Sequence, residues 1–95
     1  MTREFKKIKQ KAEEPEISIE LIDGARKINF EKDCLDQVEI LRKENYGDWI
    51  SVARNVSSPY FDEENMDENS SLQYMVRIYT KEGKEKAESI FQIML

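Results

Sequence analysis

The clearest pattern in this chain is a strict two-residue alternation over residues 72–79. Every second position is large and apolar or aromatic, and these positions are Leu72, Tyr74, Val76 and Ile78. A period of two places alternate side chains on opposite faces of a β-strand, so the segment predicts a strand with one face against a core. Any fold of this chain must therefore include a sheet with a buried face.

Two more strands are predicted on either side of Asp23-Gly24, a dipeptide typical of tight hairpin turns. Before it, apolar side chains alternate at Ile17, Ile19 and Leu21. After it, Ile28 and Phe30 continue the alternation. Residues 49–56 are rich in β-branched side chains and predict a fourth strand.

Helical spacing suggests helices in two other segments. In the first, after a possible N-cap at Asn29, one helical face would hold Cys34, Leu35, Val38 and Leu41. In the second, after Thr80, the core face would hold Ala87, Ile90, Phe91 and Met94. Ile40 and Ile93 fall outside these faces, so we expect them to form a small exposed apolar patch for partner binding or for a homodimer.

Together these elements predict an α+β fold, a two-layer sandwich of a four-stranded, mainly antiparallel sheet with two helices on one face, in the order ββαββα. Residues 1–15 are expected to form a basic N-terminal arm or a short helix that ends at Pro15. Residues 16–95 are expected to form a single α+β domain with a long acidic loop at 57–71.

The chain lacks most of the side chains that common catalytic sites need. It has no histidine, one cysteine and three glycines, which excludes His-based metal sites, histidine-activated nucleophiles and glycine-rich phosphate loops. Cys34, on the core face of a predicted helix, is expected to be a buried apolar residue. We therefore expect no enzyme activity, no catalytic residues, no cofactor and no bound metal.

Charge is unevenly distributed. The net charge is −5, yet residues 1–11 carry +4, so residues 12–95 carry −9. An acidic body repels phosphate backbones, so direct nucleic-acid binding by the body is not expected. The basic arm could instead bind an anionic surface or fold back on its own domain.

The absence of a long apolar run predicts no membrane association, and the single cysteine agrees with a cytoplasmic location. The abundance of Lys, Glu, Ile and Asn is typical of small proteins from AT-rich bacteria or their phages.

The predicted loop at 57–71 is the best candidate for recognition. It places two aromatic residues before a run of carboxylates, and the candidate partner-binding residues are Tyr60, Phe61, Asp62, Glu63, Glu64, Asp67 and Glu68. The run lacks the spacing of a calcium-binding loop. It could be a solvated loop, or a docking segment that seats an aromatic anchor in a basic partner.

These observations favour a non-enzymatic protein-interaction module, a small acidic domain that binds another protein with a basic surface and modulates or inhibits it. One alternative is an acidic inhibitor, of phage or bacterial origin, that occupies the basic groove of a nucleic-acid-binding protein. The other is a small-molecule-binding regulatory domain with its ligand between the sheet and the long loop.

Overall fold

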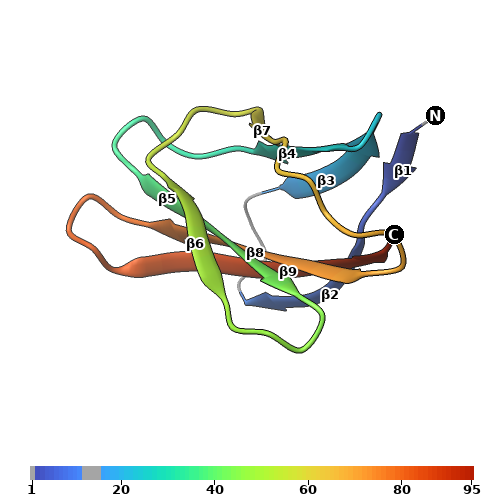
Figure 1. The fold of residues 1–95 in the computed structure, drawn as a ribbon. Coiled ribbons are helices and arrows are strands. Elements are labelled where there is room, and N and C mark those ends of the chain that lie inside the picture. Colours follow the sequence, from blue (N-terminus) through green and yellow to red (C-terminus); the bar gives the residue numbers. More distant parts are fainter. Residues whose placement is uncertain (1, 12–15) are drawn as a thin grey trace.

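The computed structural model describes residues 2–11 and 16–95, and these residues form a sandwich of two antiparallel β-sheets with no helix (Figure 1). The first sheet has the order β1-β3-β4-β7, with β1 at Thr2–Glu4, β3 at Ile17–Ile22, β4 at Ala25–Phe30 and β7 at Tyr60–Asp62. The second has the order β2-β9-β8-β5-β6, with β2 at Lys6–Lys11, β9 at Glu85–Met94, β8 at Ser71–Tyr79, β5 at Gln37–Glu44 and β6 at Ile50–Arg54. The predicted α+β class is therefore wrong.

The core lies between the two sheets and follows the alternation of the strands. In β8 the side chains at positions 72, 74, 76 and 78 are fully buried, as the sequence predicted. Ile19 and Ile28 face them from the first sheet, where they are opposite each other in the β3–β4 register. Their burial supplies much of the hydrophobic free energy that holds the sheets together.

The predicted hairpin and the predicted strand within residues 49–56 are confirmed. The turn between β3 and β4 has Asp23 at φ 49° and Gly24 at φ 85°. Positive φ at both central residues is the conformation that suits the twist of a two-residue hairpin, and it explains why Asp-Gly occurs there. The other strand is β6, at one edge of the second sheet.

The first predicted helix is instead a loop followed by strand β5. The inward positions of β5 are Val38, Ile40 and Arg42, all buried. Because the third inward residue is charged, only two inward positions are apolar and the two-residue pattern is short. Val38 and Leu41 also have the spacing of a helix, so the sequence suggested a helix instead. Cys34 lies in the preceding loop and is exposed, so the prediction that it is a core residue is wrong.

The second predicted helix is strand β9, which pairs with β8 along its whole length and with β2 on its other side. Its inward positions are Ala87, Ser89, Phe91 and Ile93. A buried serine interrupts the apolar alternation here, so the helical period looked equally good in the sequence. Pairing on both sides overrides the local helical preference.

Ile40 and Ile93 are core residues, so the expected exposed patch does not exist. Ile40 is 0% exposed and Ile93 is 6% exposed. In the strand register they lie opposite Val76 and Leu72 of β8, respectively. The prediction assigned faces by the 3.6-residue period of a helix. In a strand the faces alternate every two residues, so both isoleucines face the core. Neither side chain is therefore at the surface of the folded domain.

The basic N-terminal segment belongs to the sandwich and is not helical. Residues 2–4 pair with β3 and residues 6–11 pair with β9, so the chain passes from one sheet to the other at Phe5. The backbone N–H of Phe5 donates to the carbonyl of Ile19 at 2.9 Å, and its buried ring contacts Tyr74 edge-to-face. Of the two alternatives for the arm, the segment folds back on its own domain. Pro15, the expected helix end, lies outside the described residues.

Candidate functional site

The predicted acidic loop contains strand β7 and contacts the core through one of its acids. We call residues 60–68 the acidic segment. Asp62 is 5% exposed, and Tyr60 is half-buried beside the core. The other candidate residues of the segment lie at the surface: Phe61, Glu63, Glu64, Asp67 and Glu68. The two remaining candidates, Ile40 and Ile93, are in the core and do not join them.

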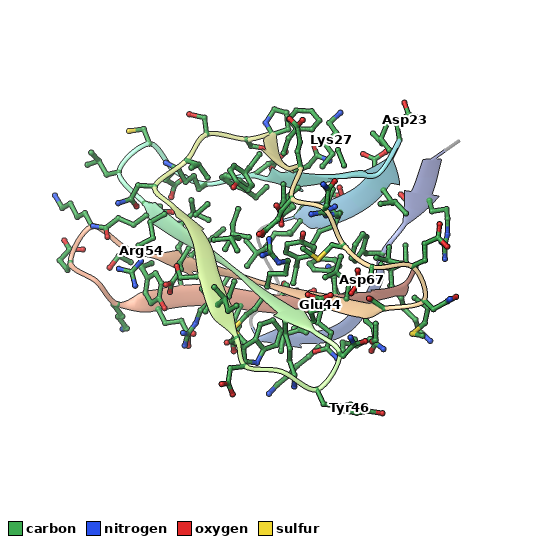
Figure 2. The ribbon with its side chains drawn as sticks, viewed as in Figure 1. Asp23, Lys27, Glu44, Tyr46, Arg54 and Asp67 are labelled. Atoms are coloured by element: carbon green, nitrogen blue, oxygen red, sulfur yellow. The ribbon has the colours of Figure 1, made fainter. Side chains whose placement is uncertain are left out.

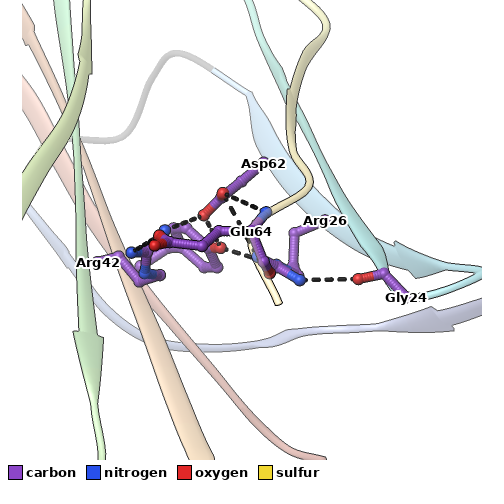
Figure 3. Close-up of polar contacts among 6 residues, drawn as sticks. Gly24, Arg26, Arg42, Asp62 and Glu64 are labelled. Atoms are coloured by element: carbon purple, nitrogen blue, oxygen red, sulfur yellow. Dashed lines mark hydrogen bonds and ion pairs between the residues drawn. The ribbon is translucent and has the colours of Figure 1, made fainter. Parts of the chain in front are cut away.

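The carboxylate of Asp62 is the centre of a polar cluster between the sheets (Figure 3). The hydroxyl of Tyr74 donates to Oδ2 of Asp62, and Nη1 of Arg42 donates to the same oxygen at 2.6 Å. Nη2 of Arg26 lies 3.4 Å from Oδ1. Asp62 and Arg26 belong to the first sheet, whereas Arg42 and Tyr74 belong to the second, so the cluster links the two layers.

The guanidinium of Arg26 binds the backbone as well as the cluster. Its Nε donates to the hydroxyl of Tyr74 at 3.0 Å and its Nη1 to the carbonyl of Gly24 at 2.7 Å. Its Nη2 donates to the carbonyl of Glu64 at 2.6 Å. The side chain of Glu64 in turn forms an ion pair with Nη2 of Arg42. These bonds hold residues 62–64 against the hairpin turn and against β5. We call Arg26, Arg42, Asp62, Glu64 and Tyr74 the polar clamp.

Burial and hydrogen bonding set the protonation states of the clamp. Burial alone would raise the pKa of Asp62, but hydrogen bonds from Tyr74 and Arg42 and the charge of Arg26 together lower it. Burial is the largest cause that raises the pKa of Tyr74 well above its ordinary value, and the hydrogen bond to Asp62 is the second. Asp62 is therefore a fixed carboxylate and Tyr74 a fixed phenol. Neither is suited to proton transfer near neutral pH, so the clamp has a structural role.

The clamp determines what the acidic segment presents to solvent. Successive side chains of a strand point to opposite faces, so the inward direction of Asp62 turns Phe61 outward. Phe61 is 45% exposed and lies opposite Lys27 of β4 in the strand register. Glu63 follows at the surface. The polar clamp thus fixes the backbone that carries the exposed ring of Phe61 and the neighbouring acid Glu63.

Sequence reasoning missed Arg26, Arg42 and Tyr74 as parts of this site. A signal was present for Arg26, because it occupies an inward position of a strand that the sequence predicted, whereas the segment of Arg42 was predicted to be a helix. A charge in such a position requires a buried partner. That partner, Asp62, could not be singled out because it stands in a run of five carboxylates.

The described residues contain no group of three or more His, Cys, Asp or Glu side chains that could hold a metal ion. Both carboxylate oxygens of Asp62 already face arginines, which leaves no place for a cation there. In the same part of the chain, no helix is long and apolar enough to cross a membrane.

No family model, no curated protein and no solved structure matches this chain.

Proposed function

We propose that this chain is a non-enzymatic interaction module that binds a partner protein with a basic surface through the acidic segment and modulates or inhibits that partner. The observation that supports the proposal best is the position of Asp62. This acid is clamped between the sheets, and the residue before it, Phe61, is exposed. The clamp therefore orders residues 62–64, and the adjacent Phe61, before any partner binds.

Such ordering matters for affinity. A loop that must become ordered on binding loses conformational entropy, and a loop that is already ordered avoids most of that cost. Phe61 is suited to be the anchor, because partly exposed aromatic rings that become buried dominate the energy of many interfaces. Glu63, Asp67 and Glu68 follow Phe61 in the acidic segment, and their charges would contribute to association rate and partner choice.

The charge of the chain supports a basic partner. Residues 12–95 carry −9, and this field accelerates encounter with a positively charged surface while it repels nucleic acid. Binding should weaken as salt is added, since the charges of the acidic segment are screened. We place this activity in the cytoplasm, because the single cysteine cannot form an internal disulfide.

A photo-crosslinking experiment tests the proposal. A photoreactive phenylalanine analogue replaces Phe61, and in a matched control it replaces Leu35, which is also exposed but lies in the loop between β4 and β5. We expect position 61, and not position 35, to crosslink one protein with a basic surface in the native host. The purified pair then gives dissociation constants for wild type, Phe61→Ala and Leu35→Ala.

The charge requirement has its own control. Glu63→Lys combined with Asp67→Lys should weaken binding of the purified pair, whereas Glu31→Lys combined with Glu82→Lys changes the net charge equally at other exposed positions. Equal losses in both double variants would show that only net charge matters and would refute the acidic segment as the site. Competition by nucleic acid would identify the partner surface as a nucleic-acid-binding groove.

A further inference from the structure

A second surface feature lies at the end of the second sheet, where the turn between β5 and β6 meets the start of β8. It is a hollow of about 430 Å³, open to solvent. This volume is within the range of small-molecule sites, about 300 to 1,000 Å³. Its floor contains Gln73 and Gln92, which lie opposite each other on β8 and β9, and its walls contain Asn45 and Asn69.

The lining of the hollow differs from the rest of the surface. Four of its eight residues carry carboxamides and one, Lys43, is charged, although 37% of the chain is charged. A carboxamide offers two donors and an acceptor without net charge. Lys43 lies over the ring of Trp49, with its Nζ 5.7 Å from the ring centroid. Most residues that line the hollow therefore have uncharged polar side chains.

Hydrogen bonds hold the wall of the hollow in place. The backbone N–H of Asn45 donates to the carbonyl of Ser71 at 2.7 Å, and the backbone N–H of Ser71 donates to Oδ1 of Asn45 at 3.0 Å. Nε2 of Gln92 donates to the hydroxyl oxygen of Ser71 at 3.3 Å. Ser71 thus joins the turn between β5 and β6 to the floor of the hollow.

Several polar groups of the hollow still have unused hydrogen-bonding capacity. Within the described part of the chain, the side chains of Asn69 and Gln73 make no hydrogen bond. Asn45 keeps its amide nitrogen and Gln92 its carbonyl oxygen for other partners. These carboxamides therefore leave both donors and acceptors available to the hydroxyls of a polyol.

An aromatic side chain stands at the rim. Tyr46 is one of the residues that line the hollow, is fully exposed, and has a side chain that projects away from the body (Figure 2). Because it packs against nothing in the described structure, a change of rotamer could bring its ring over a molecule bound in the hollow. The apolar faces of sugar rings can stack on such a ring, while their hydroxyls bond to carboxamides.

We propose that this hollow binds a neutral, polyhydroxylated ligand, one sugar unit in size, among the carboxamides of Gln73, Gln92, Asn45 and Asn69, and that the exposed side chain of Tyr46 turns over the ligand on binding. An anion would meet a single cation, Lys43, with the acids Asp67 and Glu68 close by in the chain. An apolar ligand would leave the carboxamides without partners. This site is separate from the acidic segment's exposed ring, so the two proposals can fail independently.

The test is a titration of isotope-labelled protein, followed by NMR, with glucose, galactose, mannose and N-acetylglucosamine. We expect at least one sugar to cause saturable shifts in the side-chain amide signals of Asn45, Asn69, Gln73 and Gln92. Inorganic phosphate, the control solute, should cause none. If no sugar in this panel gives saturable shifts there, or if phosphate does so instead, the proposal is refuted.

Two variants connect the shifts to the hollow without disturbing the fold. The side chain of Gln73 makes no hydrogen bond in the described structure and Tyr46 is fully exposed, so Gln73→Ala and Tyr46→Ala should both fold. Each should weaken sugar binding about tenfold, as expected for one lost polar or stacking contact. Gln37→Ala, at an exposed position at the start of β5, should leave it unchanged. Undiminished binding in both hollow variants would overturn the assignment.

Discussion

The hydroxyl of Tyr74 on β8 donates a hydrogen bond to the carboxylate of Asp62 on β7, across the interface between the two sheets. The two residues are twelve positions apart and belong to different layers. Arg26 and Arg42 complete the polar clamp around them. The acidic segment, although mostly polar, is in this way bound to the core through Asp62. The stability of the fold and the presentation of the acidic segment thus depend on the same few side chains.

Removal of the Tyr74 hydroxyl should destabilise the protein without unfolding it. Tyr74→Phe leaves Asp62 and Arg26 each one hydrogen bond short in a buried site, which costs about 1 to 3 kcal/mol. Urea unfolding measures this loss. Tyr79→Phe, on the outer face of the same strand, should change the free energy of unfolding by less than about 0.5 kcal/mol. Equal effects of the two substitutions would contradict the role given to the Tyr74 hydroxyl.

Asp62 and Glu64 both pair with Arg42, but their removal should have different effects. Asp62→Ala removes the buried carboxylate that faces Arg26 and leaves Arg42 with the exposed Glu64 alone, and it should cost about 3 to 5 kcal/mol. The side chain of Glu64 is 62% exposed, so Glu64→Ala should cost about 1 kcal/mol or less. Thermal and chemical denaturation of both variants provide the comparison. A larger loss for Glu64→Ala would show that the clamp is centred on the wrong acid.

Acid should destabilise the protein through Asp62. The folded state lowers the pKa of this carboxyl, so its contribution to stability is complete above the unfolded pKa, about 3.9. It is lost as the pH falls through the lower, folded value. We expect the free energy of unfolding to decrease below about pH 4, with part of that slope absent in Asp62→Asn. An identical slope in wild type and variant would show that Asp62 does not carry this linkage.

Truncation of Ile40 or Ile93 should lower the free energy of unfolding by as much as other large-to-small substitutions in the core. Both side chains are buried opposite residues of β8, so Ile40→Ala and Ile93→Ala should each lose about 2 to 5 kcal/mol. Leu35, which is 62% exposed, is the control, and Leu35→Ala should be nearly neutral. Chemical denaturation distinguishes these outcomes. Silent changes at both isoleucines would favour the helical surface positions that the sequence suggested.

The segments predicted correctly are those whose pattern is purely local. The hairpin between β3 and β4 depends on Asp23 and Gly24, which adopt the required positive φ angles. Strand β8 alternates without interruption because every inward residue is apolar or aromatic. In both cases a short window of sequence contains all the information that the structure uses.

Strands β5 and β9 were mistaken for helices because each has a polar residue at an inward position. Arg42 interrupts the alternation of β5, and Ser89 interrupts that of β9. With the two-residue period broken, the helical spacing of the remaining apolar residues fits equally well. The same error placed Ile40 and Ile93 at the surface. For the candidate site, the sequence indicated the acidic segment as a whole but could not separate the buried Asp62 from its exposed neighbours.

Local sequence was thus sufficient to predict one hairpin and two further strands. The composition alone determined the negative net charge and excluded chemistry that needs histidine. Tertiary structure decided that residues 37–44 and 85–94 are strands, that the basic N-terminal segment pairs with both sheets, and that Asp62 is buried. The physical reason is the cost of a buried charge, which is tolerable only beside a partner. Arg42 finds that partner twenty residues away, on the opposite sheet.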